Sequence, residues 1–210
     1  MFRRFVFLGA GAIGAGIGAM LALRGQPVLL IARGEHGEAL RRGVDLRLPE
    51  GPRRVAVPVG EVTEIGPEDL VILCTMGQDS SRAIEGLPEG QPVVSFQNGI
   101  TPLEAIQNRP LVAGMVYVPA ERRAPGVVAM QGHPVPGAIF LGRWPRGLVG
   151  VEAALAEALV DASFRAEVFE DIGPWIRAKS LANLGGTLIA LCDSPPRELL
   201  ATLVAEAQAV

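Results

Sequence analysis

A glycine-rich turn near the N-terminus carries the clearest chemical pattern in the sequence. It follows a short apolar run and opens a segment with helical character. In such a turn the first glycine permits a tight bend, the second lets backbone approach a diphosphate, and the third lets helix and strand pack closely. Unpaired N–H groups and the dipole at the helix start attract negative charge. We therefore predict a dinucleotide site whose contacts are Gly9, Ala10, Gly11, Ala12, Ile13 and Gly14.

The residue type after the next apolar run indicates which dinucleotide binds. Residues 26–32 form a second predicted strand, and Arg33 follows it directly. An acidic side chain at this point accepts the ribose 2′-hydroxyl of NAD, whereas an arginine binds the 2′-phosphate of NADP. Arg33 therefore favours NADP(H). Glu35 lies near enough in sequence to serve NAD instead, so that alternative stays open.

Polar residues in two later segments are candidates for chemistry. Asn98 follows the predicted strand 92–96, where ligands of doubly wound sheets bind, although Asn-Gly is also a common turn pair. Lys179 and Asn183 are four residues apart, so they share one face of a predicted apolar helix. A lysine there either extends to solvent or lies in a cleft with a lowered pKa. In a cleft it would be a suitable acid for a developing alkoxide.

Composition narrows the classes of function. The 210 residues are 49% hydrophobic and carry a net charge of −3, which favours a packed core and gives no basic excess for nucleic acid or membranes. Cys74 and Cys192 lie far apart, so we expect a reduced, cytoplasmic setting without a disulfide framework. His36 and His133 lack metal-ligand spacing, and we predict no metal site.

Apolar strands alternate with helical segments along the chain, which indicates a parallel sheet covered on both faces. We predict strands over residues 4–8, 26–32, 70–75, 92–96, 111–118, 127–130, 138–141 and 166–169. We predict helices over residues 15–23, 80–87, 101–108, 151–161 and 174–192, with a last helix from Ser194-Pro195. Strands 127–130 and 138–141 are expected to pair as an antiparallel hairpin after a turn at Pro125-Gly126.

The expected fold class is α/β, a Rossmann-type doubly wound parallel sheet followed by a short all-helical C-terminal segment. We place the sheet domain in residues 1–171 and the helical segment in residues 172–210. The charge-free run 5–23 also resembles a membrane span, and Gly14 and Gly18 fit a membrane helix-pair motif. Five glycines interrupt that run, so a buried strand, a turn and a helix start explain it better.

The order and spacing of these motifs resemble the ketopantoate reductase (2-dehydropantoate 2-reductase) family. The shared features are the glycine turn, Asn98-Gly99, Pro125-Gly126, and Lys179 with Asn183 after Trp175. The resemblance implies NADPH-dependent reduction of a 2-keto acid, ketopantoate to pantoate in pantothenate biosynthesis. It implies that Lys179 protonates the carbonyl oxygen and that Asn183 orients the substrate.

The resemblance also implies cofactor contacts from Asn98 and from the backbone of Ala120. A family lysine that binds the cofactor phosphate falls at Met76, and a family substrate asparagine falls at Thr187, which keeps only a hydroxyl. Family members continue past the position of Val210 as a helical domain of the 6-phosphogluconate dehydrogenase kind, which supplies a serine and a glutamate to the site. The helical segment here therefore resembles a shortened form of that domain.

Two alternatives to this reductase remain open. The first is a non-catalytic NADP(H)-binding protein, and the second is a reductase of another small polar ketone. In all cases we expect a small-molecule partner rather than nucleic acid or membrane. An uncovered apolar helix face would also require a homo-oligomer, through Leu181, Leu184, Leu188 and Leu191.

Overall fold

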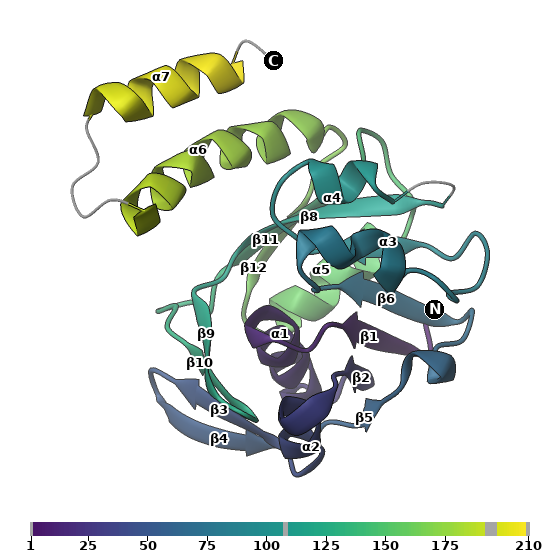
Figure 1. Cartoon of the computed structure of the whole chain (residues 1–210). Helices are drawn as coiled ribbons and strands as arrows, with labels where there is room; N and C mark the ends of the chain where they lie inside the picture. The colour runs from purple at the N-terminus through teal and green to yellow at the C-terminus, as the bar shows by residue number, and fades with distance from the viewer. Residues whose placement is uncertain (1, 107–108, 192–196, 209–210) are drawn as a thin grey trace.

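The computed structural model describes residues 2–106, 109–191 and 197–208. Its main sheet contains β1 (Arg4–Leu8), β2 (Val28–Ile31), β5 (Val59–Gly60), β6 (Asp69–Leu73), β7 (Val93–Ser95), β8 (Leu111–Tyr117), β11 (Ala138–Arg143) and β12 (Arg165–Val168). The strand order is β12-β11-β8-β7-β6-β1-β2-β5 (Figure 1). Neighbouring strands from β5 to β8 are parallel, and β11 is antiparallel to β8. The predicted Rossmann-type sheet is confirmed.

Alternate residues of β1 enter two separate cores, because successive side chains of a strand point to opposite faces. Phe5 and Phe7 pack in one core, and Val6 and Leu8 in the other. The helices are α1 (Ala12–Leu23), α2 (Gly34–Arg41), α3 (Ser80–Ala83), α4 (Thr101–Glu104), α5 (Glu152–Asp161), α6 (Gly173–Leu191) and α7 (Arg197–Gln208), with the 3-10 turns η1 (Val62–Glu64) and η2 (Gly77–Asp79). Helices α1 and α5 cover the first face, and α4 with the start of α6 covers the second.

A second, four-stranded sheet was not predicted from the sequence. Its strands are β3 (Val44–Leu48), β4 (Gly51–Val55), β9 (Ala120–Ala124) and β10 (Val127–Met130), in the order β4-β3-β10-β9. The expected hairpin of β10 with β11 is wrong, since β10 pairs antiparallel with β9 and β11 pairs with β8. The turn at Pro125-Gly126 joins β9 to β10 instead, and β9 is exposed and charged, so it lacks an apolar strand pattern.

Helix α1 lies between the two sheets, and its glycines permit the close approach. A Cβ on Gly18 would lie 2.8 Å from Leu30 Cδ2 of the main sheet. A Cβ on Gly16 would lie 3.2 Å from Met130 Sδ of the second sheet. The glycine run that resembled a membrane motif therefore serves packing inside the fold. Among the described residues, no helix combines the length and apolar character needed to cross a bilayer.

The helices after residue 79 differ in length from the prediction. Helix α3 ends at Ala83, because a glycine and a proline follow it closely, and α4 ends at Glu104. Helix α6 has nearly the predicted span, and α7 packs beside it (Figure 1). Cys192 and the predicted cap at Ser194-Pro195 lie outside the described residues, and the division of the chain at residue 171 stays a prediction.

A buried carboxylate lies at the end of the main sheet opposite the glycine turn. Asp69, at the start of β6, is 2% exposed. It accepts hydrogen bonds from Arg4 Nε at 3.1 Å, Gly66 N at 2.9 Å and Arg3 Nε at 3.0 Å. Burial raises the pKa of Asp69, but the hydrogen bonds from Arg4, Gly66 and Arg3 outweigh it and leave the pKa below its usual value. The ionised carboxylate therefore stabilises the native state at neutral pH.

We predict that Asp69→Asn lowers the free energy of unfolding by about 1–3 kcal/mol at pH 7, the range for losing charge-assisted hydrogen bonds at a buried group. Because the native pKa of Asp69 is lowered, this contribution is present above the ordinary carboxyl pKa and is lost as pH falls through the native value. Urea unfolding at several pH values measures it. The matched control is Glu121→Gln, whose ion pair with Arg123 is solvent-exposed, and we expect less than about 0.5 kcal/mol. An equal loss in both variants would contradict the account.

Candidate active site

The glycine turn lies at the carboxyl end of β1, next to β6, where the strand order reverses. Backbone hydrogen bonds fix it, from Ala10 N to Ile31 O at 3.0 Å and from Gly11 N to Gly9 O at 2.8 Å. Gly11 is the N-cap of α1 and offers no side-chain hydrogen bond to the first turn. The N–H groups that begin α1 are therefore free to bind an anion, in a position where ligands of such sheets bind.

The three motif glycines have different reasons to lack a side chain. A Cβ on Gly9 would lie 2.7 Å from Thr75 N, and Gly9 has a φ of 98°. A Cβ on Gly14 would lie 2.6 Å from Gly9 O. A Cβ on Gly11 would meet nothing within 4 Å. The fold therefore requires Gly9 and Gly14, whereas the open space at Gly11 matches the predicted approach of a diphosphate.

A buried amide links the ends of β6 and β7 beside this turn. Gln97 Nε2 donates to Thr75 O at 3.0 Å, and Gln97 Oε1 accepts from Ser80 Oγ and Ser95 Oγ, each at 3.1 Å. This network fixes the backbone that presents Asn98. The sequence analysis gave Gln97 no role, and the signal it missed was a polar side chain at the end of a buried strand.

Helix α6 places Lys179 against this end of the sheet. Lys179 Nζ donates to Asn98 Oδ1 at 2.8 Å and to the Val116 carbonyl at 2.6 Å, and it lies 4.9 Å from the centre of the Tyr117 ring. The predicted residues Lys179 and Asn98 thus meet, although they are far apart in sequence. No sequence signal pointed to the Val116 carbonyl or to Tyr117.

These groups border a cavity of about 420 Å³. Ile13 at the start of α1 forms one side, and Lys179 with Asn183 on α6 forms another. The remaining lining comes from the ends of β7 and β8: Phe96, Asn98, Val116, Tyr117, Val118 and Pro119. The cavity therefore joins the start of the predicted phosphate helix to the candidate acid.

Burial lowers the pKa of the Lys179 ammonium to about 8. Lys179 is also the only lysine in the sequence, in which every other basic side chain apart from the two histidines is an arginine. An arginine guanidinium does not release its proton near neutral pH, whereas a partly buried lysine does. The chain thus has its one exchangeable ammonium side chain in this cavity.

The other predicted site residues occupy several places. Arg33 is exposed at the N-cap of α2, and Met76 is 68% exposed at the start of η2. Ala120 begins β9, directly after the cavity residues of the β8 end. Thr187 lies on α6, and its side chain is outside the described part of the structure. Burial raises the pKa of the Cys74 thiol, in keeping with a core residue.

A histidine that the sequence left without a role connects the glycine turn to the second sheet. Gly126 N donates to His36 Nδ1 at 3.0 Å, so the hydrogen of the neutral ring is on Nε2. His36 Nε2 then donates to the Ala10 carbonyl at 2.8 Å. The imidazole therefore holds the β9–β10 turn beside the predicted phosphate site.

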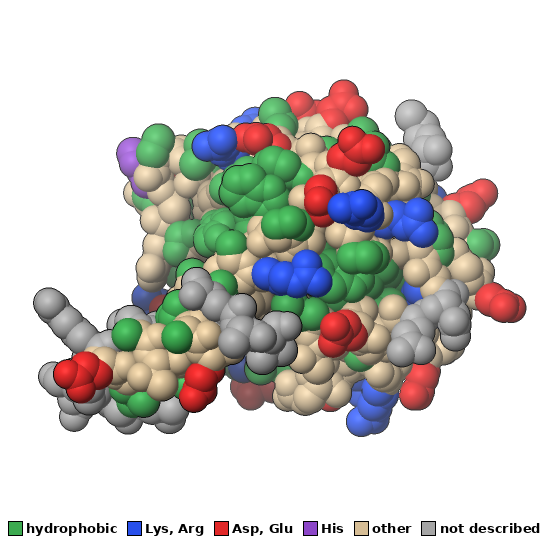
Figure 2. Space-filling model, turned by 90° about the horizontal axis from the view of Figure 1, so that it is seen from above, with side chains coloured by type: hydrophobic (Ala, Val, Ile, Leu, Met, Phe, Trp, Pro, Cys, Tyr) green, Lys and Arg blue, Asp and Glu red, His purple; other side chains and the backbone are tan. Residues whose placement is uncertain are grey.

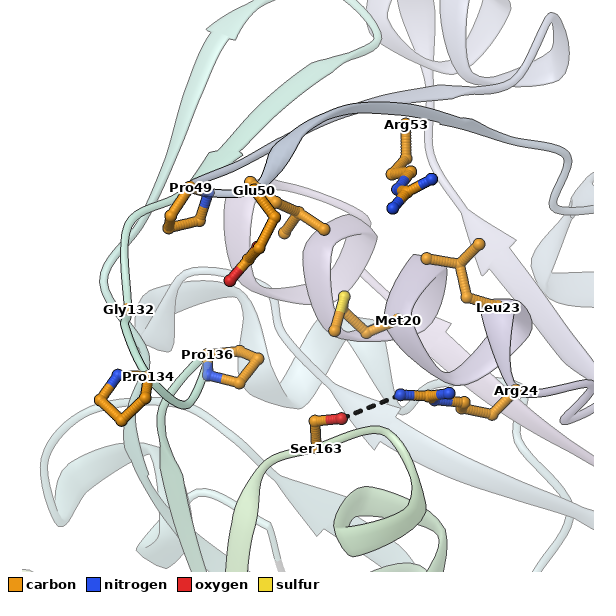
Figure 3. Close-up of a pocket in the computed structure, with 11 residues that line it drawn as sticks. Met20, Leu23, Arg24, Pro49, Glu50, Arg53, Gly132, Pro134, Pro136 and Ser163 are labelled. Carbon is orange, nitrogen blue, oxygen red and sulfur yellow. Dashed lines mark hydrogen bonds between the residues drawn. The ribbon is translucent and has the colours of Figure 1, made fainter.

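A cavity of similar size, about 380 Å³, lies at the other end of α1 (Figure 3). Met20, Leu23 and Arg24 line it from the helix, and Arg24 Nη2 donates to Ser163 Oγ at 3.0 Å. It contains none of the predicted site residues. The C-terminal end of a helix dipole is negative and disfavours phosphate, so we place the functional site at the glycine turn.

Comparison with known proteins assigns the family. The sequence profile described as ketopantoate reductase PanE/ApbA matches residues 5–146. The chain belongs to the ketopantoate reductase family. It is 30% identical over 207 residues to a 2-dehydropantoate 2-reductase of Pyrococcus abyssi, covering 93% of this chain and 67% of that protein. It is 33% identical over 189 residues to the Pyrococcus horikoshii protein of the same name, covering 86% and 60%.

Solved structures of a ketopantoate reductase family member and of a D-mandelate dehydrogenase superpose on most of this chain. A PanE/ApbA family member from Ralstonia eutropha JMP134 superposes with a TM-score of 0.72 at 28% identity, covering 86% of this chain and 61% of that one. A ternary structure of D-mandelate dehydrogenase with NADH and anilino(oxo)acetate gives 0.74 at 27% identity, covering 90% and 63%. The chain spans about two thirds or less of the length of these relatives.

We predict that Gly11→Ala and Gly14→Ala fail in different ways. A methyl group at position 11 fits the unliganded fold but fills the space expected for a diphosphate, so the variant keeps its melting temperature and loses at least about tenfold in NADPH affinity. A methyl group at position 14 collides with the Gly9 carbonyl, so that variant loses stability, by about 1–3 kcal/mol. Calorimetry and nucleotide titration measure both. Unchanged NADPH affinity in Gly11→Ala would remove the diphosphate from this turn.

Proposed function

We propose that this chain binds NADPH and reduces a 2-keto acid, with 2-dehydropantoate as the first candidate substrate. The observation that carries the proposal is the position of Lys179. Its ammonium lies in a cavity that also contains the start of α1, and its pKa is lowered to about 8. The names of the relatives, 2-dehydropantoate 2-reductase, support this substrate.

Lys179 would protonate the carbonyl oxygen of the substrate. An ammonium has three N–H donors, and Lys179 directs two of them to Asn98 Oδ1 and the Val116 carbonyl. The third N–H would donate to the substrate oxygen. When bound, NADPH would supply a hydride to the keto carbon. The ammonium would then stabilise and neutralise negative charge that develops only in the transition state.

The rest of the cavity would position the two reactants. Asn183 lines it four residues along α6 from Lys179 and would orient polar groups of the substrate. The diphosphate would bind at residues 9–14, and Asn98 and the Ala120 backbone would contact the nicotinamide end. Lys179 and Asn183 belong to the segment 172–210, so the site would lie where that segment meets the domain we propose for residues 1–171.

The proposed preference for NADPH over NADH rests on Arg33, which follows β2. Arg33 is exposed and its side chain makes no hydrogen bond or ion pair with a described residue, so its guanidinium is available for a 2′-phosphate. Met76, which stands where the resemblance expects a lysine, adds no charge. The NADH complex of D-mandelate dehydrogenase supports the broader assignment to nicotinamide dinucleotides and a 2-keto or 2-hydroxy acid substrate.

We also propose that the protein is a homo-oligomer, and we predict that native mass spectrometry detects more than one copy per particle. Hydrophobic side chains gather on the face from which α6 and α7 project (Figure 2). Tyr117 and Trp175 are 48% and 49% exposed, and Phe140 and Phe169 link them in a row of ring contacts. An exposed apolar surface of this kind favours association. We expect Trp175→Arg to shift the mass towards the monomer, and a monomeric wild type would contradict the proposal.

We predict that Lys179→Ala lowers kcat for ketopantoate reduction by about 10²- to 10⁴-fold, because it removes the proton donor. NADPH oxidation followed by absorbance measures this, and NADPH affinity should change less than about threefold. The matched control is Ser180→Ala on the next position of α6, where the hydroxyl donates to the Ile176 carbonyl within the helix. A wild type that binds NADPH but reduces no keto acid would favour the non-catalytic alternative, and activity only on other ketones would favour the reductase of another small polar ketone.

The same proposal predicts how kcat/KM for reduction depends on pH. Because the ammonium form of Lys179 is the acid, kcat/KM for reduction should be constant at low pH and fall about tenfold per pH unit above about 8. Since Lys179 is the only lysine, reductive methylation with isotope-labelled formaldehyde gives its pKa directly by NMR, apart from the α-amino group. A titration near the ordinary lysine value, 10.5, would show that the ammonium is solvated rather than buried.

A further inference from the structure

A separate cavity of about 390 Å³ adjoins the first turn of α2, immediately after Arg33. Glu35 and His36 line it from α2, and Arg122, Arg123, Ala124 and Pro125 line it from β9 and the following turn. The position of Arg33 at the carboxyl end of β2 is where a Rossmann-type sheet meets the adenosine ribose. The second sheet therefore brings two further guanidinium-bearing residues to the ribose end of the proposed cofactor site.

The His36 bridge fixes this arrangement. His36 contacts the Ala10 carbonyl of the glycine turn with one ring nitrogen and the Gly126 N–H with the other. Gly126 has a φ of 76°, and a Cβ there would lie 2.9 Å from Ala39 Cβ, so the turn packs directly on α2. Residues of β9 near this turn therefore hold a fixed position relative to the diphosphate site.

The two arginines of β9 differ in their partners. Arg123 Nη2 pairs with Glu121 Oε2 at 2.9 Å. The side chain of Arg122 makes no hydrogen bond or ion pair with a described residue, and the same is true of the side chain of Arg33. Glu35 is the one carboxylate among the cavity residues. With Arg123 neutralised by Glu121, Arg33 and Arg122 together exceed Glu35 by one positive charge, which suits a bound phosphate dianion.

We propose that Arg122 determines cofactor specificity, by binding the 2′-phosphate of the dinucleotide together with Arg33. This inference rests on the proposed function, because it deepens the choice of NADPH. It also explains how the chain could keep a preference for the phosphorylated cofactor with Met76 in the place of the family's phosphate-binding lysine. The charge that Met76 lacks is supplied from β9, across the His36 bridge.

The test compares Arg122→Gln with Arg123→Gln, which is a matched control one residue along the same strand. NADPH and NADH are titrated separately against each full-length protein. We expect Arg122→Gln to weaken NADPH binding about tenfold and to change NADH binding less than about twofold, since only NADPH carries the 2′-phosphate. Arg123→Gln should change both affinities less than about twofold, because its guanidinium is already paired.

These titrations, together with assays of keto-acid reduction by the wild type, test the role of Arg122 separately from the proposed reductase activity. Unchanged NADPH affinity in Arg122→Gln, or equal weakening of NADPH and NADH, would overturn the role of Arg122 while leaving reduction by the wild type intact. If Arg122→Gln loses affinity for NADPH alone and the wild type reduces no keto acid, the role of Arg122 is supported and the proposed reductase activity is overturned. A wild type that binds neither nucleotide would overturn both. Melting temperatures of the two variants should match the wild type, which excludes misfolding as the cause.

Discussion

The site depends on a contact that only glycine allows, between the start of α1 and the ends of β1 and β6. A side chain at Gly9 would collide with Thr75, and one at Gly14 would collide with the Gly9 carbonyl. Without side chains at these points, the first turn of α1 lies against the switch point of the sheet. Its unpaired N–H groups then face the position where a diphosphate would bind.

The same lack of side chains continues along α1 and brings the second sheet into the site. Gly16 lets Met130 of β10 approach the helix, while Gly18 lets the helix approach Leu30 of β2. Strand β9, which pairs with β10, is thereby held next to the glycine turn. Packing that stabilises the fold thus also positions groups from β9, and the His36 bridge makes that coupling direct.

The sequence predicted the main sheet well, because buried parallel strands are continuous apolar runs and the glycine turn has a specific spacing. It did not predict the second sheet, whose strands β4 and β9 are mostly exposed and charged and so show no apolar alternation. Local spacing placed Lys179 and Asn183 on one helix face, and the cavity confirms that they face the same space. The contact of Lys179 with Asn98 joins residues 81 apart, and no local pattern encodes such a distance. The carbonyl of Val116 carries no signal at all, since every residue has one.

Burial and hydrogen bonding act on Lys179 in opposite directions, and the function we propose needs both. Burial favours the neutral amine and lowers the pKa, which makes the proton easier to transfer. The acceptors at Asn98 and Val116 hold the nitrogen in place, and they favour the charged form because hydrogen bonds from an ammonium are stronger than those from a neutral amine. An arginine in this place would satisfy the same acceptors but would keep its proton. The chemistry therefore explains why a chain that uses arginine for its other cationic side chains has a lysine at this one position.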